Sequence, residues 1–228
     1  MFTNHPEAKI HNLSKGFGKK VILDQLSLDI YPGTCTGILG ENGCGKSTFL
    51  SILAGTVKAD QGNFFLRDKD LFKEPGLRRK HVGYVPQGTP LMDELTAMDH
   101  LRLWYPGKKE IYKDLEDGVL GMLGIGDFLK VPVSHMSGGM KKRLSIGCAV
   151  ADHPDILLLD EPSAALDLIC KERISVYLSQ FKARGGMILL TTHDIQELPL
   201  CDRLFILKQG KLAPYHYDGN YHRLAGSL

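Results

Sequence analysis

Short apolar runs alternate with longer amphipathic segments over most of this chain. Residues 35–39, 156–159 and 187–190 are mostly apolar and of strand length, which predicts buried strands. Residues 47–54 and residues 168–183 have the pattern and the boundary residues of helices. Strands with few polar positions that alternate with helices favour an α/β fold, in which helices cover both faces of a parallel sheet.

The first third of the chain also contains strand patterns with a polar side. Residues 22–30 alternate apolar and polar positions over their second half and end at the turn signal Tyr31-Pro32-Gly33. Residues 63–66 and 82–85 are further short strand candidates, and Pro86 ends the second of them. Such alternation is typical of a half-buried strand.

From about residue 88 to residue 151 the pattern becomes helical. Residues 93–104 carry apolar side chains at helical spacing, and residues 115–123 are a second candidate helix. The polar stretch 106–109 begins with a Pro-Gly pair and is expected to separate the two. These residues therefore form a helical block between strand-forming segments.

Composition and charge limit the class of protein. The chain has 228 residues, 43% hydrophobic and 24% charged, and its net charge of +2 gives no electrostatic argument for nucleic acid. The five cysteines lie far apart without metal-site spacing, and their odd number fits a reducing, cytosolic compartment. The first residues do not resemble a signal peptide, and no apolar run approaches the roughly 18 residues of a membrane span. A membrane role is therefore expected to depend on a partner.

The most informative motif is the GxxxxGK[ST] sequence at residues 40–47. Gly43 and Gly45 allow backbone N–H groups to point inward, where they can bind phosphate. Lys46 adds a positive charge for the β- and γ-phosphates, and the Ser47 hydroxyl is a ligand for Mg²⁺. An ordinary glycine-rich turn is the alternative, which the flanking strand and helix disfavour. The residues expected to surround the phosphates are Gly40, Glu41, Asn42, Gly43, Cys44, Gly45, Lys46, Ser47 and Thr48.

A pair of acidic residues, Asp160 and Glu161, follows the apolar run 156–159. A buried strand would deliver Asp160 to the carboxyl edge of the sheet, where α/β folds bind ligands and where it could hold Mg²⁺ opposite Ser47. Glu161 could then polarise a water for attack on a γ-phosphate. Strands that end in acidic residues are also common without such a role, so this pair alone does not decide the function.

Four shorter motifs occur in a fixed order around these two. They are Gly83-Tyr84-Val85-Pro86-Gln87, Ser137-Gly138-Gly139-Met140-Lys141-Lys142-Arg143, Ser163-Ala164-Ala165-Leu166-Asp167 and Thr191-Thr192-His193-Asp194. Together with the phosphate-binding loop and the acidic pair, this ordered set resembles the ATP-binding subunit of an ABC transporter. The resemblance covers almost the whole chain and implies an ATPase that uses ATP and Mg²⁺.

The resemblance implies roles for single residues. Phe17 matches the aromatic residue that stacks on adenine, with a core aromatic as the alternative. Gln87 matches a residue that contacts Mg²⁺ and the attacking water, Glu161 matches the general base, and His193 matches a residue that contacts the γ-phosphate. The implied catalytic residues are Lys46, Gln87, Glu161 and His193. The implied metal ligands are Ser47, Gln87 and Asp160.

Two further matches imply a second subunit. Ser137, Gly138 and Gly139 match the signature that binds the γ-phosphate of ATP held by the opposite subunit, and the helix that they open favours an anion at its N-terminus. Asp167 matches a residue that communicates across that dimer. The resemblance thus implies a pair of ATP-binding subunits, expected to be a homodimer, on the cytoplasmic face of a membrane. It also implies an integral membrane partner, with no nucleic acid expected.

The same resemblance implies the fold and its organisation. Residues 1–228 are expected to form one ATP-binding domain, a P-loop core of mostly parallel sheet flanked by helices, with an antiparallel β portion near the N-terminus. Residues 1–87 and 152–228 would form the ATPase core. Residues 88–151 would form an inserted helical subdomain that carries the signature.

Other details of the sequence indicate a branch of the family, and two alternative functions stay open. The signature run is most similar to the branch of drug-, peptide- and polysaccharide-export ATPases and lipid-moving transporters. Met136, Met140, Cys44 and Ala165 differ from the commonest residues of the family, but none removes an atom that the chemistry requires. The basic cluster 141–143 is interpreted as a solvated helix face. A soluble ATPase of the same superfamily that drives assembly, and a module that senses ATP without hydrolysis, are the alternative functions.

Overall fold

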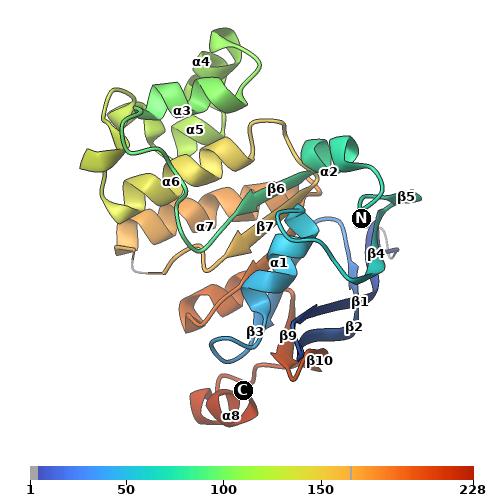
Figure 1. The fold of residues 1–228 in the computed structure, drawn as a ribbon. Coiled ribbons are helices and arrows are strands. Elements are labelled where there is room, and N and C mark those ends of the chain that lie inside the picture. The colour runs from blue at the N-terminus through green and yellow to red at the C-terminus, as the bar shows by residue number, and fades with distance from the viewer. Residues whose placement is uncertain (1–4, 165) are drawn as a thin grey trace.

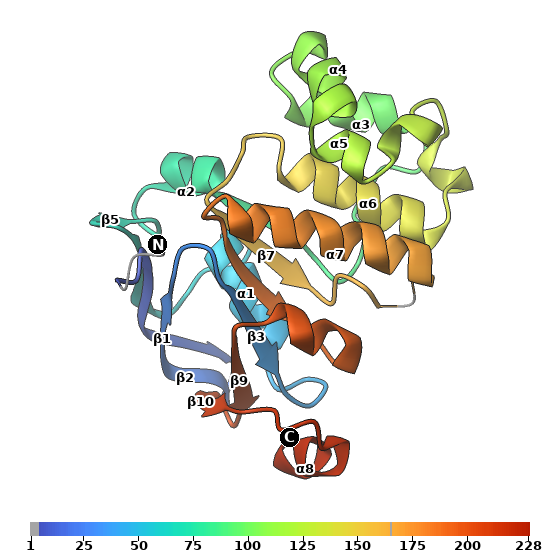
Figure 2. The same cartoon turned by 180° about the vertical axis from the view of Figure 1, so that it is seen from behind.

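Two sheets form the framework of the computed structural model, which describes residues 5–164 and 166–228. An antiparallel sheet has the order β2-β1-β4-β5, and a six-stranded sheet has the order β10-β9-β3-β8-β7-β6 (Figures 1 and 2). The strands are β1 (Ala8–Phe17), β2 (Lys20–Ile30), β3 (Cys35–Leu39), β4 (Gln61–Leu66), β5 (Lys69–Asp70), β6 (Val82–Val85), β7 (Ile156–Asp160), β8 (Met187–Thr191), β9 (Arg203–Lys208) and β10 (Lys211–Tyr215). All neighbours in the second sheet are parallel except β9 and β10. The expected α/β fold, with an antiparallel portion near the N-terminus, is confirmed.

Helices cover the six-stranded sheet on both faces. The α-helices are α1 (Lys46–Ala54), α2 (Pro75–His81), α3 (Ala97–Trp104), α4 (Lys108–Asp117), α5 (Val119–Met122), α6 (Gly138–Ala149), α7 (Leu168–Ala183) and α8 (Tyr221–Ser227), and the 3-10 helices are η1 (Ile125–Phe128), η2 (Val133–His135) and η3 (Ile195–Leu200). Helix α1 packs on one face of the sheet, and α6 and α7 lie on the other (Figures 1 and 2). In the described part of the chain, no helix is both long and apolar enough to cross a membrane.

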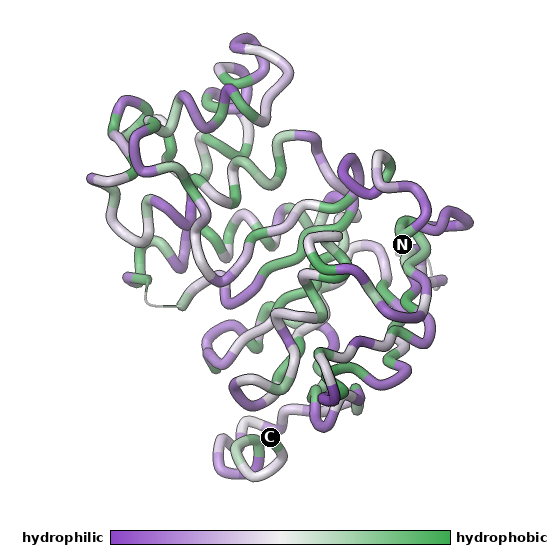
Figure 3. The backbone as a smooth tube through the Cα atoms, in the orientation of Figure 1, coloured by the Kyte–Doolittle hydropathy of each residue, from purple (hydrophilic) through white to green (hydrophobic). Residues whose placement is uncertain are grey.

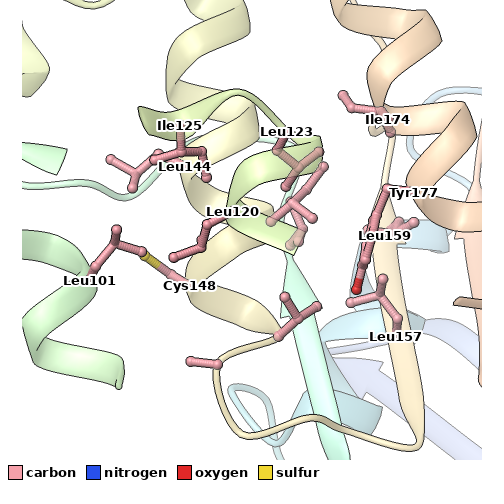
Figure 4. Packing of buried hydrophobic residues seen from close by; sticks show 14 of the residues in the cluster. Leu101, Leu120, Leu123, Ile125, Leu144, Cys148, Leu157, Leu159, Ile174 and Tyr177 are labelled. Atoms are coloured by element: carbon pink, nitrogen blue, oxygen red, sulfur yellow. The ribbon is translucent and has the colours of Figure 1, made fainter. Parts of the chain in front are cut away.

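Successive side chains of β7 point to opposite faces of the sheet, and both faces are buried, which explains why residues 156–159 are all apolar. Ile156 and Leu158 pack in the cluster around α1, whereas Leu157 and Leu159 pack in the cluster around α6 and α7 (Figure 4). All four side chains are completely buried. The backbone coloured by hydropathy shows apolar residues along the inner strands and many polar residues on the outer loops (Figure 3).

The predicted helices of the helical block are only partly correct. Helix α3 begins at Ala97 rather than at residue 93, because Thr96 caps it: the Thr96 hydroxyl accepts from Asp99 N, and the Asp99 carboxylate accepts from Thr96 N. The predicted helix at 115–123 is helical over most of its length but is not one helix, because α4 ends at Asp117 and α5 begins at Val119, with a break at Gly118. The expected polar break at 106–109 is also too long, since α4 starts at Lys108.

Candidate nucleotide-binding and hydrolysis site

Four parallel strands end at one edge of the six-stranded sheet, and each leads into a candidate site segment. Strand β3 leads into the loop at 40–45, and β6 leads to Gln87. Strand β7 ends at Asp160, and β8 is followed by His193. Carboxyl ends of parallel strands meet at the same edge, which is where α/β folds bind ligands. Segments that lie far apart in the sequence are thus brought to one place.

The loop at 40–45 surrounds the positively charged ammonium group of Lys46. Gly45 has φ = 113°, and a Cβ atom there would lie 2.8 Å from the side chain of Ile22, so glycine is required. The Lys46 ammonium donates to the carbonyl oxygens of Gly40 at 2.7 Å and Glu41 at 3.0 Å. Because Lys46 is buried and starts α1, its charge is held inside the loop, at a helix N-terminus that favours phosphate.

Asp160 is a buried carboxylate at the end of β7. The Thr191 hydroxyl on the neighbouring strand donates to Asp160 Oδ1 at 2.5 Å, which fixes the carboxylate in the sheet edge. Ser47 is exposed in the first turn of α1, which packs against β7. A carboxylate and a hydroxyl are hard oxygen donors of the kind that Mg²⁺ prefers. The chemistry of these donors therefore fits a magnesium ion.

Glu161 is the point where the other polar side chains converge. Gln87 Nε2 donates to Glu161 Oε2 at 2.8 Å, and His193 Nε2 lies 3.1 Å from Glu161 Oε1. The Glu161 backbone has φ = 49°, an uncommon conformation that its N–H stabilises by donating to Thr191 O at 3.1 Å. Partial burial and the charge of Lys46 lower the pKa of His193, although Glu161 and Asp160 act in the opposite direction. The ring is therefore neutral near pH 7.

The signature residues lie at the start of α6, beside the start of α7. The Ser137 hydroxyl accepts from Met140 N at 3.3 Å and caps α6, while Asp167 Oδ1 accepts from Cys170 N at 2.8 Å and caps α7. A Cβ atom on Gly139 would lie 3.8 Å from Asp167 Oδ2, so the two motifs are in contact. Within residues 5–164 and 166–228, no hydrogen bond joins Ser137 to the phosphate-binding loop.

Phe17 lies at the end of β1, where 54% of its surface is exposed. The alternative interpretation as a core aromatic is therefore wrong. The Lys15 ammonium lies 5.2 Å from the centre of the ring, close enough for a cation–π interaction. An exposed ring of this kind is available for stacking.

The basic cluster on α6 is not the solvated helix face that the sequence suggested. Lys142 is 4% exposed and donates to Pro86 O and Gln87 O, both at 3.1 Å. Arg143 donates to Leu123 O at 2.7 Å. No local sequence pattern marks Lys142 as buried, because the groups that it contacts are main-chain carbonyls of a segment more than fifty residues away.

Glu197 is a second buried polar residue that sequence reasoning missed. It lies on η3 after His193, and its Oε1 accepts from Ser163 N at 3.1 Å. Burial raises the pKa of Glu197, and the hydrogen bonds from Ser163 and Thr192 partly offset this. The contact joins the segment after Glu161 to the segment after His193. No sequence motif singles it out.

Comparison with known proteins agrees with this arrangement. A model of the family described as ABC transporter matches residues 23–164. The chain belongs to the ABC transporter family. The family resemblance inferred from the six motifs is therefore confirmed. This part of the chain includes the phosphate-binding loop, the signature and the acidic pair of an ABC transporter ATP-binding cassette.

Individual relatives of this ABC transporter cassette have names that refer to export or resistance. The chain is 37% identical to Nod factor export ATP-binding protein I of Sinorhizobium fredii, over 89% of this chain and 60% of that protein. It is 34% identical to the linearmycin resistance ATP-binding protein LnrL of Bacillus subtilis, over 88% of this chain and 66% of that protein. The chain thus spans less than two thirds of the length of these relatives.

Solved structures with the same fold include a dimeric ATP-binding cassette. A dimeric post-hydrolysis state of one such cassette, bound to ADP and Pi, superposes with a TM-score of 0.81 and 28% identity, covering 91% of this chain and 97% of that one. An ATP-binding subunit of an ABC transporter superposes with a TM-score of 0.83 and 27% identity, over 96% of this chain and 93% of that one.

Proposed function

We propose that this ABC transporter cassette hydrolyses ATP and that the energy drives transport through a separate membrane subunit. The observation that carries the proposal is the convergence of Gln87 and His193 on the Glu161 carboxylate, at the edge of the sheet where the Lys46 loop begins α1. A phosphate-binding loop alone would support ATP binding. The three polar side chains beside it supply what hydrolysis needs in addition.

In the proposed binding mode, different residues of the chain contact the adenine ring and the phosphates of ATP. The exposed Phe17 ring would stack on adenine, and residues 40–48 with the Lys46 charge would hold the phosphates. The proposed magnesium ligands are Ser47, Gln87 and Asp160. When bound, Mg²⁺ would neutralise charge that develops on the β- and γ-phosphate oxygens.

In the proposed mechanism, Glu161 accepts a proton from the attacking water. Gln87 and His193 each lie against a different oxygen of the Glu161 carboxylate and so fix its orientation. A neutral His193 with its proton on Nε2 would donate to Glu161 and stabilise the carboxylate form that a base requires. The positively charged Lys46 would bind the phosphates. Glu161, and not Lys46, would accept the proton of the attacking water.

We also propose that the working unit contains two copies of the cassette. Leu168 and Ile169, at 76% and 70% exposure, form an apolar pair directly after Asp167, beside Gly139. Exposed apolar residues next to candidate binding residues favour an interface. In such a dimer, Ser137, Gly138 and Gly139 of one copy would face the nucleotide on the loop of the other, and ATP would stabilise the closed pair because it contacts both.

The direction of transport is proposed from the relatives. One is named for Nod factor export and another for linearmycin resistance, which supports export for this chain. The partners would be a second ATP-binding subunit and an integral membrane subunit. The cassette would then lie on the cytoplasmic face of the membrane, where it is supplied with ATP.

The proposal is tested with Glu161→Gln, which keeps the shape of the side chain but removes the base. Phosphate release from ATP in the presence of Mg²⁺ is expected to fall by about 10²–10⁴-fold, while ATP affinity changes little. Size-exclusion chromatography should then show an ATP-dependent dimer. Glu172→Gln, the same substitution at an exposed position of α7, is the matched control. Wild-type turnover in Glu161→Gln, or no turnover in the wild type, would overturn the proposal.

A further inference from the structure

Lys142 is a buried cation, and within the part of the chain that the structure describes its ammonium group hydrogen-bonds to main-chain oxygens only. It donates to Pro86 O and Gln87 O, and among the described residues no carboxylate lies within ion-pair distance of it. Burial lowers the pKa of Lys142, and the charges of Asp160, Glu161 and Glu197 oppose this change. A buried lysine is costly compared with an apolar residue of similar size. Simple packing therefore does not account for it.

The contact joins two parts of the proposed hydrolysis machinery. Lys142 lies on α6 three residues after Gly139, so its backbone is rigidly linked to the signature. Gln87, whose carbonyl Lys142 holds, donates from its side chain to Glu161 at 2.8 Å. One side chain thus connects the helix that begins with the signature to the residue that orients the candidate base.

We propose that Lys142 is a positioning residue that ties Gln87 to α6, so that Gln87 reaches Glu161 only when α6 is correctly placed. The inference rests on the proposed function of Gln87 and Glu161 in ATP hydrolysis. Movement of α6 relative to the six-stranded sheet would carry the Gln87 backbone with it and withdraw or deliver the amide. The position of the signature helix α6 would thereby determine, through Lys142, whether Gln87 contacts the candidate base Glu161.

The neighbouring basic residues do not share this role. Lys141 is 27% exposed in its side chain, and its ammonium faces Asp93 at 3.8 Å. Arg143 contacts the main chain of Leu123 and lies over the ring of Phe128, with 5.0 Å to the ring centre. Neither hydrogen-bonds to the segment at 86–87. Lys141→Met is therefore a matched control for Lys142→Met, on the same helix and with the same loss of charge.

The decisive experiment is a double-mutant cycle on ATP turnover by the full chain. Lys142→Met is expected to lower kcat about tenfold or more, with KM for ATP changed less than about twofold. In a Gln87→Ala background, Lys142→Met should change kcat by less than about twofold, because no side-chain amide remains to be positioned. Lys142→Arg, which keeps the donors, should restore most of the activity. An equal loss of kcat in both backgrounds, or full activity of Lys142→Met, would overturn the inference.

A second measurement does not depend on hydrolysis. Hydrogen exchange of the segment around Gln87 is expected to increase at least about fivefold in Lys142→Met and to stay unchanged in Lys141→Met. Unchanged exchange in Lys142→Met would also overturn the inference. If Lys142→Met does not fold, Lys142→Gln takes its place, with the same expectations. An inactive wild type whose exchange still depends on Lys142 would defeat the proposed function but not the contact between α6 and Gln87.

Discussion

Gly139 lies where any side chain would collide with α7. A Cβ atom at this position would be 2.5 Å from Cys170 Sγ, whereas ordinary contacts of a Cβ atom lie at 3.4–4 Å. Gly139→Ala is therefore expected to displace Cys170 and to cost about 1–3 kcal/mol of stability, the usual result of overpacking. The better helix propensity of alanine offsets up to about 1 kcal/mol of this cost. The melting temperature should fall by about 2–4 °C for each net kcal/mol lost.

Removal of the Cys170 thiol isolates the cause of this effect. In Cys170→Ala the colliding sulfur is absent, and the Cβ atom that remains lies at 3.4 Å. Gly139→Ala should then be neutral, or stabilising by up to about 1 kcal/mol, because only the helix propensity is left. Gly138→Ala is the control, since a Cβ atom added at Gly138 would meet no other atom within 4 Å. Urea unfolding followed by circular dichroism measures all four changes, and equal destabilisation by Gly139→Ala in both backgrounds would refute the collision.

Three further predictions concern the nucleotide site and the core. Lys46→Ala should weaken ATP binding about tenfold or more, because it removes the charge inside the loop, and an unchanged dissociation constant in calorimetry would contradict this role. Since partial burial and Lys46 lower the pKa of His193, a nuclear magnetic resonance titration of the nucleotide-free chain should give a midpoint below about 6.5. The folding stability that the neutral His193 ring contributes above about pH 6.5 should be lost as the pH falls through that midpoint. A midpoint above about 6.5 would contradict this, because protonation of His193 would then stabilise the folded chain. Leu158→Ala, at a completely buried position, should cost about 2–5 kcal/mol in urea unfolding, and a cost below about 1 kcal/mol would contradict its place in the core.

The sequence was sufficient for the strands that are covered on both faces. Strands β7 and β8 agree with their predicted ranges to within one residue, because an uninterrupted apolar run of strand length is typical of a strand buried on both faces of a parallel sheet. The order of the parallel strands was not predicted. The carboxyl edge of the sheet was predicted as the place of Asp160, whereas Glu161 and His193, which lie far apart in the chain, were assigned to one site by the family resemblance. The structure places these two side chains against each other.

Strand β1 shows why other elements were not predicted. Its pairing with β2 shifts register three times, so the alternation of apolar and polar residues is interrupted along the strand. Asn12 has φ = 50° within this irregular stretch. A bulge depends on the partner strand, which a local pattern does not reveal. The same limit applies to Lys142, whose buried position depends on carbonyl groups from a distant loop.

The position of β3 in the sheet has a consequence for biosynthesis. This strand carries the phosphate-binding loop, yet it hydrogen-bonds to β8 and β9, which are made of residues 187–191 and 203–208. During synthesis the loop therefore leaves the ribosome long before its supporting strands exist. Contacts that connect such distant residues also form slowly. Nucleotide can bind a correctly shaped loop only after residues 203–208 have been translated, which delays any ATP-dependent step until then.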